Sequence, residues 1–256
     1  MAFDQEEFIR LITDHYEFCH CVYWNDYPIS RAPEGGWPQI TPEALAGLAK
    51  NEDVLNLKHA DYRYQLGYVH DVINSLDQLE FIPEPSHQRH PPGLPASCIT
   101  IAYKRFANCR AGGYSVVIDT ENGYVYCTDL DRLQKEPEAE LNGTLELFNH
   151  ADPAQRWRCC EAINVYTPAD FFELCKGRFL ETRWIVLLPW SILLPWSISA
   201  LPMFIKEASD FMSEHADWAR GLRESGWPGD GEGRDWDARK FRAFLVEKYP
   251  KMFIVY

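Results

Sequence analysis

The chain has 256 residues and a net charge of −13, and 46% of its residues are apolar and 14% aromatic, a composition typical of a globular protein rich in rings. The surplus of acidic groups argues against nucleic-acid binding, which depends on clustered Lys and Arg, and against docking on anionic lipid. We expect one domain, residues 1–256, with a helical part (1–82), a Pro-rich crossover (83–97) and a sheet-containing part (98–256).

Helical signals dominate the N-terminal part. Asp4 is a helix-capping residue, and the apolar spacing after it predicts a helix to about Cys19. Thr41-Pro42 combines an N-cap with a proline at the first helical position, so a second helix is expected to begin there and run toward position 50. A third helix is expected from Asp61 to Phe81, where aliphatic residues share one face.

A change of composition after the crossover predicts a sheet. Cys98 to Tyr103 and Tyr114 to Asp119 are rich in β-branched and aromatic residues, as strands are. Tyr124 to Thr128 is the expected return strand of a hairpin, with Asn122-Gly123 at its turn. The sheet should therefore be small and mainly antiparallel.

The remaining chain predicts further helices. Thr167-Pro168 repeats the capping pattern and predicts a helix to about Glu181. Helical spacing also predicts a helix over Phe204 to Leu222, which the glycine-rich stretch Ser225 to Asp235 ends. The other expected elements are a strand over Arg183 to Leu188, a helix over Asp237 to Tyr249 and a strand over Met252 to Tyr256. The fold class is α+β: a helical N-terminal part packed on the sheet, with C-terminal helices.

One apolar hexamer occurs twice in succession, as LLPWSILLPWSI from Leu187 to Ile198. A membrane helix needs about 20 mostly apolar residues, and the repeated prolines would break one here, so no membrane span is expected. We interpret the repeat as an apolar loop. Trp190 and Trp196 either cover the core or form a lid or a partner-docking patch, which makes them candidate binding residues.

Two acidic or mixed clusters are candidate sites, whereas nucleotide-binding and hydrolase motifs are missing from the sequence. Asp129 and Asp131 follow a strand, where paired carboxylates bind either Mg²⁺ or only solvent. The second cluster combines an acid/base group, a carboxylate and a guanidinium, which either act on a small molecule or simply start a helix. Its members, the candidate catalytic residues, are His59, Asp61, Tyr62 and Arg63.

The eight cysteines indicate free thiols. His15, Cys19, His20 and Cys21 crowd together, but a structural zinc site usually needs two well-spaced ligand pairs, so no metal and no cofactor are expected. The first residues, MAFDQEEF, lack the basic and apolar regions of a signal peptide. We therefore expect a cytoplasmic protein with reduced cysteines.

Four segments in order along the chain resemble a large family of uncharacterised filamentous-fungal proteins. They are GGWPQIT with VLNLKHADYRY, GGYSVVIDTENGYVY, PADFFELCKGRFLETRWI and RESGWPGDG. Residues 98–184, with their V-I-D-T-x-x-G-x-V-Y hairpin, acidic loop and helix with paired aromatics, are also similar to the SUKH superfamily. This superfamily includes a yeast cell-wall regulator and bacterial toxin-immunity proteins, and its members bind proteins and carry no catalytic residues.

These observations leave two hypotheses about function. The first is a cytosolic binding or interaction module, which the missing catalytic motifs and the SUKH resemblance favour. The second is a cofactor-independent enzyme, of fungal secondary metabolism, that acts on a small molecule in an aromatic-lined pocket. A deep cavity with convergent polar groups would favour the enzyme, and a flatter acidic surface edged by aromatic residues would favour the module.

Overall fold

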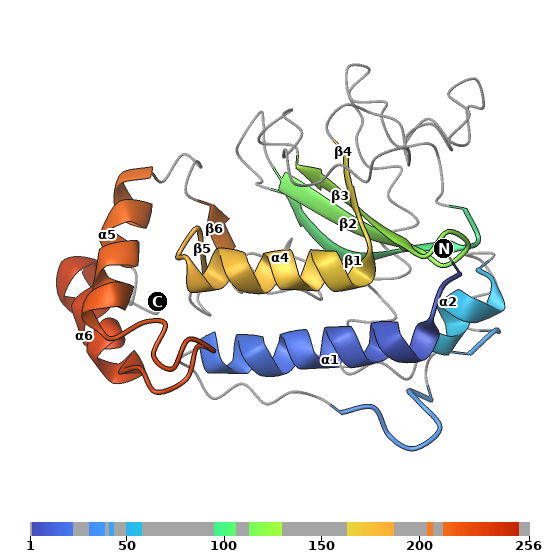
Figure 1. Cartoon of the computed structure of the whole chain (residues 1–256), viewed down its shortest axis with the longest axis horizontal. Coiled ribbons are helices and arrows are strands. Elements are labelled where there is room, and N and C mark those ends of the chain that lie inside the picture. The colour runs from blue at the N-terminus through green and yellow to red at the C-terminus, as the bar shows by residue number, and fades with distance from the viewer. Residues whose placement is uncertain are drawn as a thin grey trace.

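The computed structural model describes residues 2–22, 31–38, 41–43, 50–57, 95–105, 113–129, 163–186, 204–206 and 212–250. Its elements are α1 (Gln5–Val22), α2 (Glu52–Asn56), β1 (Cys98–Arg105), β2 (Gly113–Asp119), β3 (Tyr124–Asp129), β4 (Ile163–Tyr166), α4 (Pro168–Leu180), β5 (Trp184–Val186), β6 (Phe204–Lys206), α5 (Met212–Glu224) and α6 (Ala238–Lys248). In Figure 1, α1 and α4 lie side by side, with β1 to β4 near one end of the pair and α5 and α6 at the other. The α+β fold class is confirmed.

The sheet of β1 to β4 is antiparallel, with its strands in chain order. The predicted hairpin is confirmed, because Asp119 at the end of β2 pairs with Tyr124 at the start of β3. Strand β4 was not predicted. Its four residues, which pair with β3, are too few to show a period of their own, so its formation depends on the neighbouring strand.

The turn between β2 and β3 is organised by Asp119, whose side chain is fully buried. Its carboxylate accepts hydrogen bonds from the backbone N–H of Glu121 at 3.1 Å and from the side-chain amide of Asn122 at 2.6 Å. Gly123 donates its N–H to the carbonyl of Asp119 and has a φ of +72°. The turn predicted at Asn122-Gly123 therefore has its positive φ at the glycine.

Replacing Gly123 with valine is expected to lower the free energy of unfolding by about 1 kcal/mol or more, because a β-branched residue tolerates positive φ poorly. Gly123→Asn is the matched control, since asparagine enters this region more readily and should cost less. Urea denaturation of both variants measures the difference. A valine variant as stable as the parent would show that the fold does not need the positive φ.

Local capping starts the two long helices where the sequence predicts them. The carboxylate of Asp4 accepts the backbone N–H three residues further on at 2.9 Å, and α1 then continues past the predicted end at Cys19 to Val22. The hydroxyl of Thr167 accepts the N–H three residues on at 3.1 Å, and Pro168 is the first residue of α4. Both interactions satisfy N–H groups that the helix itself leaves unpaired.

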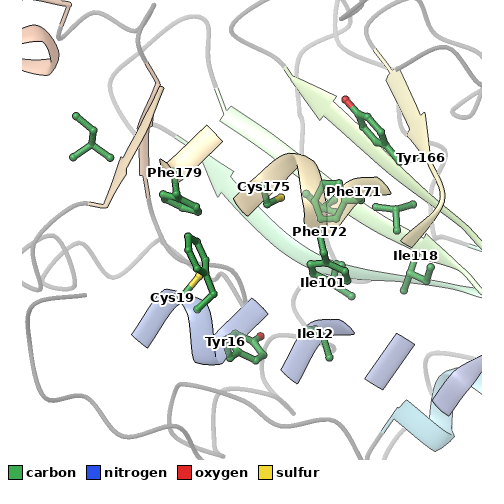
Figure 2. Close-up of a cluster of buried hydrophobic side chains, with 14 of the residues drawn as sticks. Ile12, Tyr16, Cys19, Ile101, Ile118, Tyr166, Phe171, Phe172, Cys175 and Phe179 are labelled. Carbon is green, nitrogen blue, oxygen red and sulfur yellow. The ribbon is translucent and has the colours of Figure 1, made fainter. Parts of the chain in front are cut away.

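A continuous apolar core joins α1, α4 and the sheet. Figure 2 shows its labelled members, which are Ile12, Tyr16 and Cys19 of α1, Ile101 and Ile118 of the sheet, Tyr166, and Phe171, Phe172, Cys175 and Phe179 of α4. The rings of Phe171 and Phe172 meet edge to face with centroids 5.4 Å apart. Because burial of each such ring contributes about 1.5–3 kcal/mol, this core fixes the position of α1 against α4.

The helix predicted over Phe204 to Leu222 is wrong in its first turn. Phe204 to Lys206 form β6, which pairs antiparallel with β5, and the helix that follows, α5, begins at Met212. Backbone pairing with Trp184 to Val186 overrides the helical spacing, because both segments consist mainly of residues that favour strands. The later part of the stripe is confirmed, since Trp218 and Leu222 are buried in the core.

Other predictions differ in how far the structure tests them. The last predicted helix is confirmed as α6, with Asp237 as its N-cap, whereas α2, capped by Asn51, was not predicted. Five predictions fall wholly or mostly outside the described residues. They are the helix after Thr41-Pro42, the helix over 61–81, the Pro-rich crossover, the strand over 252–256 and the duplicated hexamer. The single-domain organisation also stays a prediction.

Candidate functional site

Most of the site residues predicted from sequence lie outside the described residues. These are His59, Asp61, Tyr62, Arg63, Asp131, Trp190 and Trp196. Asp129 is the last residue of β3, where its backbone pairs with that of Tyr114. The acid/base cluster, the carboxylate pair and the two tryptophans therefore stay predictions.

A groove of about 490 Å³ lies between α1, α4 and residues 225–236, which we call the C-terminal loop. We call it the α1–α4 groove. The buried residues of its lining are His15, Phe18 and Phe172, and the part-buried Leu11 and Cys21 extend this surface. These residues form a narrow apolar floor, and most of the other lining residues are charged.

His15 is the most deeply buried titratable residue of the groove lining, with 4% of its surface exposed. Its Nε2 lies 3.4 Å from the Sγ of Cys19, and its ring centroid lies 5.3 Å from that of Phe172. Nδ1 is buried and has no hydrogen-bond partner within the described residues. Burial lowers the pKa of His15 to about 4, so the imidazole is neutral near pH 7.

This arrangement makes His15 costly to the fold. A buried polar atom without a partner costs about 1–3 kcal/mol, so stability alone does not favour a histidine here. The neighbouring Cys19 is fully buried, which closes the His–Cys pair to any substrate in the groove. The pair has the residue types of a nucleophile and its base, but it lacks the access that such chemistry requires.

The rim of the groove is charged, and its basic groups are already bound within the protein. The basic lining residues form the ion pairs Arg10–Asp14 at 2.9 Å, Arg234–Asp230 at 3.2 Å and Lys176–Glu232, and Glu17 of the lining pairs with Arg31 outside it at 2.8 Å. Glu173 is an exposed residue of the lining, and it forms no ion pair within the described residues. The rim is consequently left with uncompensated negative charge.

The C-terminal loop forms one end of the groove and is held by hydrogen bonds to both helices. The indole N–H of Trp236 donates to the carbonyl of Cys21 in α1 at 3.2 Å. The indole N–H of Trp227 donates to the carbonyl of Phe179 in α4 at 3.1 Å. The ring centroids of these two tryptophans lie 5.2 Å apart in an edge-to-face contact, so the loop, α1 and α4 form one packed unit.

Within the described residues, no disulfide joins the cysteines, which are Cys19, Cys21, Cys98, Cys127 and Cys175. Burial raises the pKa of the Cys21 thiol, against an opposing effect of Arg234, so this groove residue is a weak nucleophile at neutral pH. His20 is exposed whereas His15 and Cys19 are buried, so the cluster that resembles a zinc site does not converge. Among the described residues, no group of three His, Cys, Asp or Glu side chains is placed to hold a metal ion.

No protein-family model, no curated protein and no solved structure matches the chain. The resemblances to the fungal family and to the SUKH superfamily therefore stay predictions. Within the part of the chain that the structure describes, no helix has the combination of length and hydropathy that a membrane-spanning helix needs.

The α1–α4 groove was not predicted from sequence. From sequence, His15 was considered only as a possible zinc ligand beside Cys19. Its burial depends on α4, which covers this face of α1 in the structure. One signal in the sequence could have indicated the groove. The capped helix after Thr167 carries two adjacent phenylalanines, Phe171 and Phe172, which point in different directions from the helix and therefore require two packing partners.

Proposed function

We propose that this chain is a binding module that docks a segment of a partner protein in the α1–α4 groove. The observation that carries the proposal is the groove itself, which has a narrow apolar floor formed by Leu11, Phe18 and Phe172 and a charged rim. Apolar grooves between two helices with polar edges are a common way to bind a partner helix.

The state of the reactive groups supports binding over catalysis. A nucleophile must be within reach of the substrate, and Cys19, the thiol beside His15, is fully buried. Most of the charged groups of the rim are bound to one another and do not converge on one point. The enzyme hypothesis rests on His59 and its neighbours or on the loop of Asp129 and Asp131, and of these residues the structure describes Asp129.

The proposed module works on proteins in the cytosol. Cysteines without disulfide bonds, as found among the described residues, are typical of a reducing compartment. The net charge of −13 favours protein partners over nucleic acid. A role in protein binding is also what the resemblance of residues 98–184 to the SUKH superfamily implies.

Blocking the groove is expected to abolish partner binding without unfolding the protein. Ala169 is exposed, lies in the first turn of α4 and belongs to the groove lining. Ala169→Arg places a long side chain across the groove and should weaken capture of the partner from a cytosolic extract at least ten-fold. Val246→Arg is the matched control, because Val246 is an apolar residue of α6, 44% exposed and outside the lining.

The measurement compares proteins captured by the immobilised parent and by the two variants, with the melting temperature of each as a check of folding. A partner retained by the parent and by Val246→Arg and lost by Ala169→Arg supports the proposal. If Ala169→Arg is folded and retains everything that the parent captures, the groove is not the docking surface.

A further inference from the structure

The groove has the length of about three helical turns. Its lining along α1 runs from Arg10 to Cys21, a distance of about 16 Å at 1.5 Å per residue. Lining residues of α4 extend from Ala169 to Lys176, so the apolar surface around Phe172 is bounded by both helices. A helix bound in such a groove inserts apolar side chains at positions i, i+3 or i+4, and i+7.

The charge of the rim favours a bound segment of positive charge. The three basic lining residues, Arg10, Lys176 and Arg234, are each paired with a carboxylate of the chain. Glu173 is left on the rim without an ion pair within the described residues, next in sequence to the buried Phe172. The chain as a whole has 38 acidic and 25 basic side chains, which adds to the attraction for a cationic partner.

The groove already holds one cation of the chain itself. The ammonium group of Lys176 lies 5.8 Å from the ring centroid of Phe18 and pairs with the carboxylate of Glu232. An ammonium group over an aromatic face is attracted by the ring, and the aliphatic stem of a lysine covers apolar surface. The lining of the groove therefore accommodates a basic side chain that combines a cation with an apolar stem.

We infer that the occupant of the α1–α4 groove is an amphipathic helix of a partner protein that carries Lys or Arg beside its apolar stripe. This inference rests on the proposed function. The apolar stripe packs on the floor formed by Leu11, Phe18 and Phe172, and a basic residue at its edge pairs with Glu173. The rim favours such a helix over an acidic one because every acidic side chain brought to Glu173 adds repulsion.

Two helix-stapled peptides test the inference. Both have about 14 residues and the same leucine stripe, and one carries lysine and the other glutamate beside the stripe. Titration of fluorescent peptide into the full-length protein should show at least ten-fold tighter binding of the lysine peptide, and this preference should shrink in about 0.5 M salt. Glu173→Gln should weaken binding of the lysine peptide about three-fold, whereas Ala169→Arg should weaken it at least ten-fold.

Glu181→Gln is the matched control for Glu173→Gln, because Glu181 is an exposed carboxylate at the other end of α4 and outside the groove lining. It should leave both affinities unchanged. Equal binding of the two peptides, or equal effects of the two Gln variants, overturns the inference. If neither peptide binds while Ala169→Arg still loses a cytosolic partner, the inference falls and the docking proposal stands. If Ala169→Arg loses neither peptide nor partner, both proposals fall.

Discussion

Replacing Gly229 with alanine is expected to lower the free energy of unfolding by about 3 kcal/mol or more. Gly229 has a φ of +66°, and a Cβ added there would lie 1.5 Å from the backbone oxygen of Arg234. That oxygen accepts the N–H of Asp230 at 3.0 Å and belongs to the backbone of the C-terminal loop, so it cannot rotate away as a side chain would. The loop must open to admit the methyl group.

Gly231→Ala is the matched control. Gly231 also has positive φ, at +88°, but its added Cβ would have no atom within 4 Å. This variant should therefore cost only the backbone strain, about 1 kcal/mol. Urea denaturation of both proteins separates the strain from the clash. Equal losses of stability would show that the loop does not close on Gly229 in the way described.

The second large effect is expected on acidification. The pKa of His15 is about 4 in the fold against 6.5 for an ordinary histidine, so between these values the unfolded chain binds the proton that the folded chain excludes. Above about pH 6.5 His15 is neutral in both the folded and the unfolded chain, so its contribution to stability is independent of pH there. Stability falls as the pH drops from 6.5 toward 4 and changes no further below that. The pKa difference corresponds to a loss of about 3 kcal/mol.

His15→Leu isolates this effect because it removes the titrating group and keeps an apolar side chain in its place. The variant retains the other titratable or charged groups of the groove, which also respond to acid or contribute to its electrostatic potential. They are Arg10, Asp14, Glu17, Cys21, Glu173, Lys176, Glu232 and Arg234. Urea denaturation at a series of pH values should give a steeper loss of stability between pH 6.5 and 4 for the parent. Parallel curves would mean that His15 becomes protonated in the fold without cost.

Elements with local signals were predictable from sequence. Helix α4 starts at Thr167-Pro168 because a capping hydroxyl and a preset proline φ act within one turn of chain. The hairpin formed where Gly123 allows the turn. Strands β4 and β6 were missed or misassigned because each has only a few residues and exists through pairing with β3 or β5, which no local pattern records.

The groove was harder to predict than the fold. Its lining combines His15 and Phe18 of α1 with Phe172 of α4, which lie far apart along the chain. Helical spacing shows which side chains of one helix share a face, but it does not show which second helix covers that face. The lowered pKa of His15 likewise depends on burial by α4 and becomes apparent only in the packed structure.

The joining of α1 to the C-terminal loop has a consequence for synthesis of the protein on the ribosome. The apolar face of α1 is made first, yet α4 begins only at Pro168 and Trp236, which donates to Cys21, comes later still. At a synthesis rate of about 5–20 residues per second, α4 is completed on the order of 10 seconds after α1. During that interval the nascent chain exposes apolar residues that are buried in the folded protein, among them Phe8, Ile12 and Tyr16. We therefore expect this segment to be a target for a chaperone that binds apolar segments.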